Sequence, residues 1–95
     1  MEDKLTIYQS HFLKALSNPV RLKLIKKLLS DEKCQCEIIK EFNKAQSTIS
    51  QHLGILVKTG ILESRPEGQK IFYRVRNNKI LHIIDLSREI IEQNI

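Results

Sequence analysis

Two short stretches of this sequence carry side chains suited to chemistry at a molecular surface. In the first, Cys34 and Cys36 place two thiols two residues apart. Thiolates bind soft metal ions and are also readily oxidised. The second stretch spans residues 45–56, and its polar side chains are uncharged: Gln46, Ser47, Thr48, Ser50, Gln51 and His52. Such donors and acceptors suit hydrogen bonding to the edges of nucleic-acid bases, whereas a solvated helix face is usually richer in Lys and Glu.

The elements that must position these residues follow from apolar spacing and from capping signals. Apolar residues recur at helical spacing in the second stretch, which predicts a helix over about residues 46–58 that ends at Gly60. A shorter helix precedes it, because Cys34 stands three residues before Glu37, the spacing of a capping box. We expect Cys34 to be the N-cap of that helix. Two helices joined by a short turn, the second with a polar outer face, form a helix-turn-helix arrangement.

The flanking sequence predicts two helices before this pair and a hairpin after it. One helix covers about residues 2–17, and the next begins with Asn18 as N-cap and Pro19 as its first residue. After Gly60, two β-prone runs flank a turn at residues 66–69, which predicts a two-stranded hairpin, or wing. Its basic side chains are placed to reach phosphates beside a groove: Arg65, Lys70, Arg74 and Arg76.

The last predicted helix, about residues 78–94, is apolar on more than one side. Ile80, Ile84 and Ile91 form one row, and a second row holds Ile83, Leu86 and Ile90. One apolar stripe is enough to bury a terminal helix in its own domain, so two rows favour a second copy of the chain as cover.

Length and charge agree with a small binding domain. The 95 residues fit one domain spanning 1–95, with a core that is barely sufficient alone. Residues 40–76 hold seven basic and three acidic side chains, a net charge of +4 within a total of +5. A basic middle segment suits a surface that faces phosphates. No apolar run is long enough to span a membrane, and the first residues lack the pattern of a signal peptide. We therefore expect a cytoplasmic protein whose two cysteines are reduced thiols.

Taken together, these segments resemble the ArsR/SmtB family of winged-helix repressors over roughly residues 8–90. The most specific parts are "ALSNPVRLKLI" and "QSTISQHLGILVKTGIL". The resemblance implies a mainly α fold with a small β-hairpin, a homodimer built from the first and last helices, and binding to a palindromic operator in double-stranded DNA. Ala45 departs from the Ser common in the family, and an alanine cap is weaker by about 1 kcal/mol. We therefore expect this helix to start differently from the corresponding helix of the family.

The resemblance also gives Cys34 and Cys36 a role, because they match the Cys-x-Cys pattern of the family's thiol sensing site. Soft ligands of this kind suit arsenic(III), antimonite, cadmium, lead or zinc. The third cysteine of the arsenical pattern is replaced by Ile39, and His11 is the only nearby imidazole that we can propose as a third ligand. Asn77 and Lys79 replace the Asp-x-His pair of the family's other metal site, so that site is not expected. The effector stays open between a thiophilic ion, oxidation of the pair, and another effector or none.

Two other classes of function compete with a DNA-binding regulator. A winged helix that binds protein needs large apolar patches on its outer helix, and this helix exposes none beyond its core stripe. An enzyme needs a nucleophile with its base, or a glycine-rich phosphate loop, and a deep pocket. The acidic residues Asp85, Glu89 and Glu92 look like a solvated edge. The sequence therefore predicts neither an enzyme nor a membrane partner.

Overall fold

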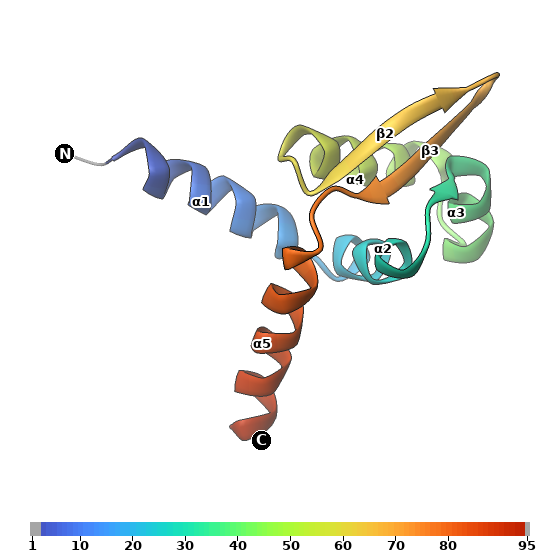
Figure 1. Cartoon of the computed structure of the whole chain (residues 1–95). Coiled ribbons are helices and arrows are strands. Elements are labelled where there is room, and N and C mark those ends of the chain that lie inside the picture. The colour runs from blue at the N-terminus through green and yellow to red at the C-terminus, as the bar shows by residue number, and fades with distance from the viewer. Residues whose placement is uncertain (1–2, 95) are drawn as a thin grey trace.

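The computed structural model describes residues 3–94, which form five helices and three short strands (Figure 1). In chain order these are α1 (Lys4–Leu16), α2 (Pro19–Ser30), β1 (Lys33–Cys34), α3 (Gln35–Phe42), α4 (Gln46–Lys58), β2 (Leu62–Glu67), β3 (Lys70–Val75) and α5 (Lys79–Gln93). The winged helix-turn-helix order expected from the sequence is confirmed. The helices predicted over about residues 2–17, 46–58 and 78–94 lie within two residues of these bounds, and residue 2 itself is outside the described residues.

Capping residues explain where α2 begins and where α4 ends. The Asn18 side chain accepts hydrogen bonds from the amides of Val20 and Arg21 at 2.9 and 3.1 Å, and Pro19 is the first residue of α2. At the end of α4, Gly60 adopts φ +79° and its amide donates to the carbonyl of Val57. This left-handed conformation suits glycine, because a Cβ is strained there. Ala45 gives α4 no side-chain cap, but the helix still begins at Gln46, as the apolar spacing predicts.

The core lies where α2, α3 and α4 pack on the small sheet. Its completely buried side chains come from several elements and from the turn after α4: Leu24, Ile25, Ile38, Ile49, Leu53, Leu56, Ile61 and Leu62. The apolar residues of α4 that the sequence spacing placed on one stripe are all in this set. Because α4 is held by its inner stripe, its outer side is free to face another molecule.

The expected hairpin forms from β2 and β3, and β1 adds a third antiparallel strand, so that the order is β1-β3-β2. The two residues of β1 pair with Tyr73 and Phe72 of β3. A strand of two residues has no periodicity in the sequence, and β1 is a strand only because it pairs with β3. The predicted turn at 66–69 is also shorter in the structure, because Pro66 and Glu67 belong to β2 and the loop is Gly68-Gln69. Proline is tolerated there because β2 is an edge strand.

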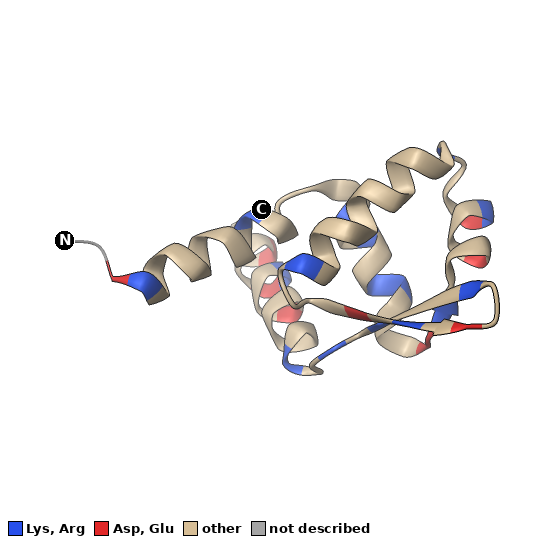
Figure 2. Ribbon diagram, turned by 90° about the horizontal axis from the view of Figure 1, so that it is seen from above, with Lys and Arg blue, Asp and Glu red and all other residues tan. Residues whose placement is uncertain are grey.

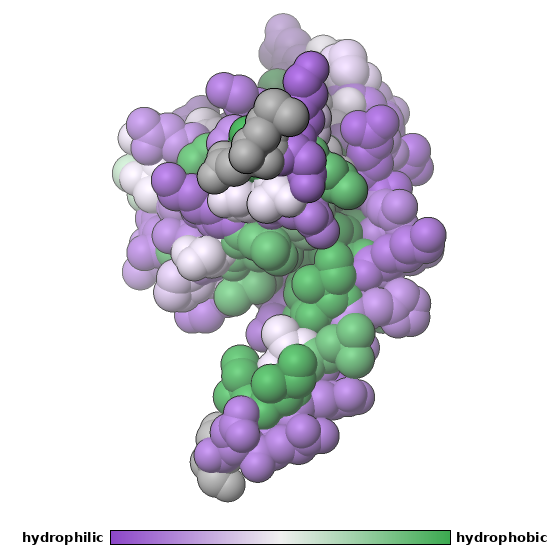
Figure 3. All heavy atoms as spheres, turned by 90° about the vertical axis from the view of Figure 1, so that its left-hand side faces the viewer, coloured by the Kyte–Doolittle hydropathy of each residue, from purple (hydrophilic) through white to green (hydrophobic). Residues whose placement is uncertain are grey.

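Both terminal helices project from the body, α1 to one side and α5 downward in Figure 1. Each carries large apolar side chains that remain exposed within one chain. On α1 these are Leu5, Ile7, Tyr8 and Leu13, and on α5 they are Leu81, Leu86, Ile90 and Ile91. Figure 3 shows apolar surface along α5 and on the body beneath α1. Of the two rows predicted on α5, Ile80 and Ile84 are buried, whereas Ile91 is exposed. Among the described residues, no helix is long and apolar enough to cross a membrane.

Candidate functional site

The outer side of α4 is polar and almost free of charge. Ser47 and Gln51 are exposed one turn apart, and Thr48 beside them is half-buried. Lys58 is the only charged residue of the helix, and Figure 2 shows α4 as a long uncharged stretch. The preceding turn and the hairpin add two exposed cations, Lys44 and Lys70. This surface combines directional hydrogen-bonding groups in the middle with positive charge at its margins.

Two of the predicted base-contacting residues, Ser50 and His52, lie on the flanks of α4 and already have partners within the chain. Ser50 is half-buried, and its hydroxyl accepts a hydrogen bond from Gln35 Nε2 at 2.8 Å. The other amide atom of that side chain, Gln35 Oε1, accepts from the Tyr73 hydroxyl at 3.1 Å. Ser50 therefore joins α4 to α3 and β3. Gln46 is exposed at the first residue of α4.

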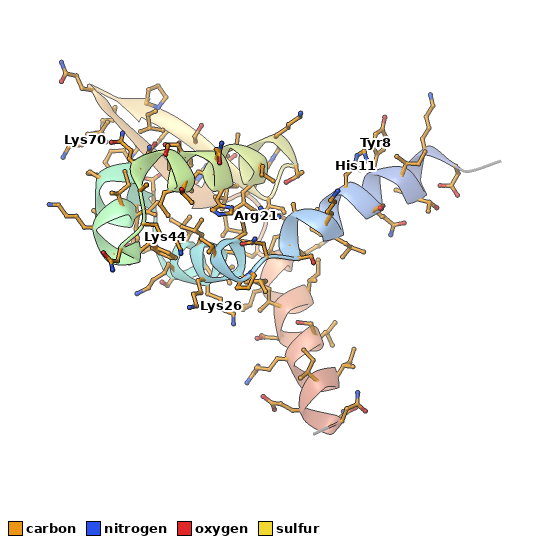
Figure 4. The ribbon with its side chains drawn as sticks, turned by 180° about the vertical axis from the view of Figure 1, so that it is seen from behind. Tyr8, His11, Arg21, Lys26, Lys44 and Lys70 are labelled. Carbon is orange, nitrogen blue, oxygen red and sulfur yellow. A yellow bond between two sulfur atoms is a disulfide. The ribbon has the colours of Figure 1, made fainter. Side chains whose placement is uncertain are left out.

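His52 is held on the opposite flank by Arg21. The guanidinium Nη1 lies 3.2 Å from His52 Nδ1, while Nε and Nη2 donate to the carbonyls of Ala15 and Lys14. Arg21 thus joins α2 to the end of α1 and to α4, and Figure 4 shows it where these helices meet. A guanidinium only donates, so Nδ1 accepts and the neutral ring carries its proton on Nε2.

The pKa of His52 is lowered by burial of the ring first and by the positive charges of Arg21 and Lys44 next. The imidazole is therefore neutral at physiological pH and presents Nε2–H as a hydrogen-bond donor.

The predicted wing cations divide into two groups: Arg65 and Arg74 have acidic partners, whereas Lys70 and the exposed Arg76 have none among the described residues. Arg65 forms a two-oxygen ion pair with Glu32, contacts Glu67 and stacks over the Phe72 ring. Arg74 pairs with Glu63 across the hairpin. Lys70, at the start of β3, has no acidic partner among the described residues. Most of the hairpin's arginine charge is therefore balanced within the chain.

Cys34 and Cys36 form a disulfide, which corrects the expectation of two reduced thiols. The reason is the backbone of Cys34. As expected for the N-cap of α3, it is extended, with φ −78° and ψ 154°, and its amide donates to Glu37 Oε1 at 3.2 Å. Side chains two residues apart inside a regular helix point away from each other, but Cys34 precedes the helix with an extended backbone, which lets its side chain meet that of Cys36; the Cα–Cα distance of 5.3 Å is within the range of disulfides.

The surroundings of the two sulfurs differ. Cys34 is 2% exposed, whereas Cys36 is exposed to solvent. A cleft of about 490 Å³ opens beside the pair between α3, the start of α4 and the hairpin. Its remaining lining consists of Gln35, Ile39, Lys40, Gln46, Gln69, Lys70 and Ile71. Cys36 is therefore the more accessible of the two cysteines to a reagent in solvent.

The donor set around the pair does not complete a metal site. Among residues 3–94, no three His, Cys, Asp or Glu side chains are grouped closely enough to hold an ion. His11, the imidazole considered from the sequence, lies on α1 in the cleft between α1 and α4 (Figure 4). A protein zinc site ordinarily has three or four protein ligands, and this chain brings two sulfurs together.

Sequence reasoning missed the residues that connect the predicted ones. Gln35 and Arg21 were not singled out, although each holds one flank of α4, and Glu32 was not recognised as the partner of Arg65. One signal was present: a glutamine stood between two cysteines at the start of a helix. Its partners lie 15 and 38 residues further along the chain and have no local signature.

Comparison with known proteins agrees with this arrangement. Residues 18–64 match the profile described as "Bacterial regulatory protein, arsR family". An uncharacterized HTH-type transcriptional regulator of Methanocaldococcus jannaschii is 40% identical over 82 residues, covering 85% of this chain and 92% of that protein.

Two further likenesses concern regulators with named functions. The cadmium resistance transcriptional regulatory protein CadC of Listeria innocua is 37% identical over 78 residues, which cover 81% of this chain and 66% of CadC. The crystal structure of the transcriptional repressor BigR from Xylella fastidiosa superposes with a TM-score of 0.78 at 34% identity, covering 92% of this chain and 89% of BigR.

Proposed function

The chain belongs to the ArsR family of DNA-binding transcriptional regulators, and from this premise we propose that it is a repressor that binds a palindromic operator as a homodimer. The relatives with a stated role are regulators of transcription and not enzymes. We place this activity in the cytoplasm, where the operator is.

The observation that supports operator binding is the outer side of α4. Ser47, Thr48 and Gln51 present hydrogen-bonding groups without charge, and a glutamine amide pairs with adenine through two hydrogen bonds. Gln46 extends this surface at the first turn, and the neutral His52 adds a donor at its edge. Lys44, Lys58 and Lys70 surround the surface and suit phosphates. Ser50, Arg65 and Arg74 remain candidate contacts, provided that they exchange their present partners for DNA.

The exposed apolar faces of α1 and α5 support the homodimer. A cleft of about 730 Å³ between α2 and α5, with Leu22, Leu29 and Leu81 in its wall, continues the apolar face of α5. A two-fold dimer covers equal faces of both chains at once. It would also place two α4 helices about 34 Å apart, in successive major grooves.

The Cys34–Cys36 pair is the proposed regulatory site, with oxidation as the signal. A peroxide takes two electrons and two protons from the dithiol, which becomes the disulfide, and leaves as two waters. In a reducing compartment a disulfide is transient, as a redox signal requires. The exposure of Cys36 gives an oxidant access. We propose that the dithiol form binds the operator and that the disulfide form is released.

A thiophilic ion is the second candidate effector, because the CadC relative is named for cadmium resistance. Arsenic(III), cadmium, lead and zinc all suit thiolate ligands. The two sulfurs of one chain do not complete such a site, as described above. A new thiolate-to-metal ultraviolet band on adding cadmium to the reduced protein, absent in Cys34→Ser, would favour the ion over oxidation. If neither oxidation of the thiol pair nor addition of cadmium changes operator affinity, the repressor has another effector or none.

The test of operator binding uses the reduced protein, DNA from its own promoter region and a salt titration. Counterion release predicts that log K falls linearly with log salt, with a slope of about −0.9 for each phosphate neutralised. We expect Gln51→Ala to cost about 1–3 kcal/mol on the operator and little on unrelated DNA. Gln93→Ala, at the end of α5, is the matched control. An affinity for DNA that does not change with salt concentration, or no binding to the promoter, would instead favour a winged helix that binds protein.

A further inference from the structure

Gln35 contacts two other elements from its position between the two cysteines. Its Nε2 donates to Ser50 on α4 at 2.8 Å, and its Oε1 accepts from the Tyr73 hydroxyl on β3 at 3.1 Å. It is also the first residue of α3, directly bonded to Cys34 and Cys36. Three elements therefore meet at one amide, next to the disulfide.

The two hydroxyl partners fix the orientation of this amide. Tyr73 is 8% exposed, and burial raises its pKa, so the hydroxyl remains protonated and donates. A donor at Tyr73 requires the amide oxygen of Gln35 to face it. The amide nitrogen then points to Ser50, whose hydroxyl oxygen accepts. Each hydrogen bond therefore supports the other, and both depend on where the backbone of α3 holds Gln35.

The state of the thiol pair bears directly on that backbone. In the disulfide form the bond clamps the N-cap residue Cys34 to Cys36, with Gln35 between them. Opening the bond frees this first turn, which carries the Gln35 side chain. A hydrogen bond of 2.8 Å is largely lost beyond about 3.5 Å, so a shift of less than about 1 Å suffices to break the contact with α4.

We infer that Gln35 is a positioning residue that transmits the state of Cys34 and Cys36 to α4 through Ser50. In the disulfide form Gln35 holds Ser50 on the flank of α4, and in the dithiol form that hydroxyl is released toward the outer side. Tyr73 keeps the amide aligned for this contact. The inference rests on the proposed regulation by the thiol pair and names the route by which that site reaches the DNA-facing helix.

Gln35→Met tests the route, because methionine keeps the length of the side chain and removes both hydrogen-bonding groups. The measurement is the ratio of operator affinity in the dithiol and disulfide forms. Coupling between two sites commonly corresponds to a 5–150-fold ratio, and we expect the wild type to lie in this range. In Gln35→Met the ratio should fall to within about twofold of unity. A residue that only stabilises α3 would instead lower both affinities alike and leave the ratio unchanged.

Linkage supplies a second readout that does not rely on comparing affinities. If the thiol state alters DNA binding, DNA must alter the dithiol–disulfide midpoint potential by the same free energy. Operator DNA should therefore shift the potential of the wild type and not that of Gln35→Met. Ser50→Ala breaks the link from the α4 side and should give the same loss, which covers the case in which the first variant folds poorly. Gln93→Met should retain the full ratio.

The outcomes separate this inference from the proposed function. A wild-type ratio of unity would overturn both, because nothing would then be transmitted. A wild-type ratio that persists in Gln35→Met and in Ser50→Ala would overturn the role of Gln35 alone. Loss of the ratio in both variants, with the disulfide still forming, would establish it.

Discussion

Replacing Leu86 by alanine should weaken self-association of this protein much more than it weakens the fold. Leu86 lies on the second apolar row of α5 and is 57% exposed in the single chain. Full burial of a leucine side chain contributes about 1.5–3 kcal/mol. The part still exposed is therefore expected to contribute about 1 kcal/mol when a second copy covers it.

Two-fold symmetry doubles this contribution, because each chain buries its own Leu86 in the same interface. The expected loss is about 2 kcal/mol per dimer, and 1.4 kcal/mol corresponds to a tenfold change in a dissociation constant. We therefore expect the dimer of Leu86→Ala to dissociate at a roughly 30-fold higher protein concentration than the wild type.

The assay is sedimentation equilibrium over a dilution series, with far-ultraviolet circular dichroism to verify that helix content is retained. Ile71→Ala is the matched control, because Ile71 is also a large apolar residue, 43% exposed, but lies on the hairpin. It should leave the dimer unchanged. An equal effect in both variants, or a wild type that is monomeric at micromolar concentration, would refute the assignment of the α5 face to a second copy.

Four further results are expected from the contacts described. Asn18→Ala removes the cap of α2 and should lower stability by about 1 kcal/mol, seen as a fall of about 4–8 °C in Tm. Gly54→Ala should raise stability by about 1 kcal/mol in urea unfolding, because the added Cβ meets no atom within 4 Å outside its chain neighbours and the local backbone of its own helix. Lys58→Gln and Lys70→Gln should each make the salt slope of operator binding shallower by about 0.9; unchanged slopes would exclude them as phosphate contacts. Because the pKa of His52 is lowered in the fold from 6.5, the contribution of His52 to stability should be constant above about pH 6.5 and fall as the pH drops below it; His52→Gln should remove this part of the pH dependence of the urea midpoint.

The sequence was sufficient for the helix order and for the outer side of α4. Periodicity located the buried stripe of that helix, and Ser47 and Gln51 on the opposite side are exposed as predicted. The positions of Asn18, Cys34 and Gly60 at helix ends also followed from local capping rules, because a cap depends on residues within one turn.

Contacts between distant segments were beyond such local rules. Ser50 and His52 were predicted to lie on the outer surface. Their side chains instead contact Gln35 and Arg21, respectively, which lie 15 and 31 residues away in the chain. Likewise, the charges of the hairpin were visible in the sequence, but not that Glu32 lies opposite Arg65. The pairing of the cysteines depended on one backbone conformation, that of Cys34. Spacing within a regular helix argued against it, and only the extended N-cap removed that obstacle.

The ion pairs of the hairpin change what a DNA strand would meet there. A phosphate that approaches Arg65 has to displace the carboxylates of Glu32 and Glu67, which exchanges one anion for another and releases few additional counterions. The affinity for DNA and its dependence on salt would then come mostly from the lysines and Arg76, while Arg65 and Arg74 hold the hairpin in place through their ion pairs. A count of basic residues in the sequence would therefore overestimate the electrostatic contribution to the affinity of this protein for its operator.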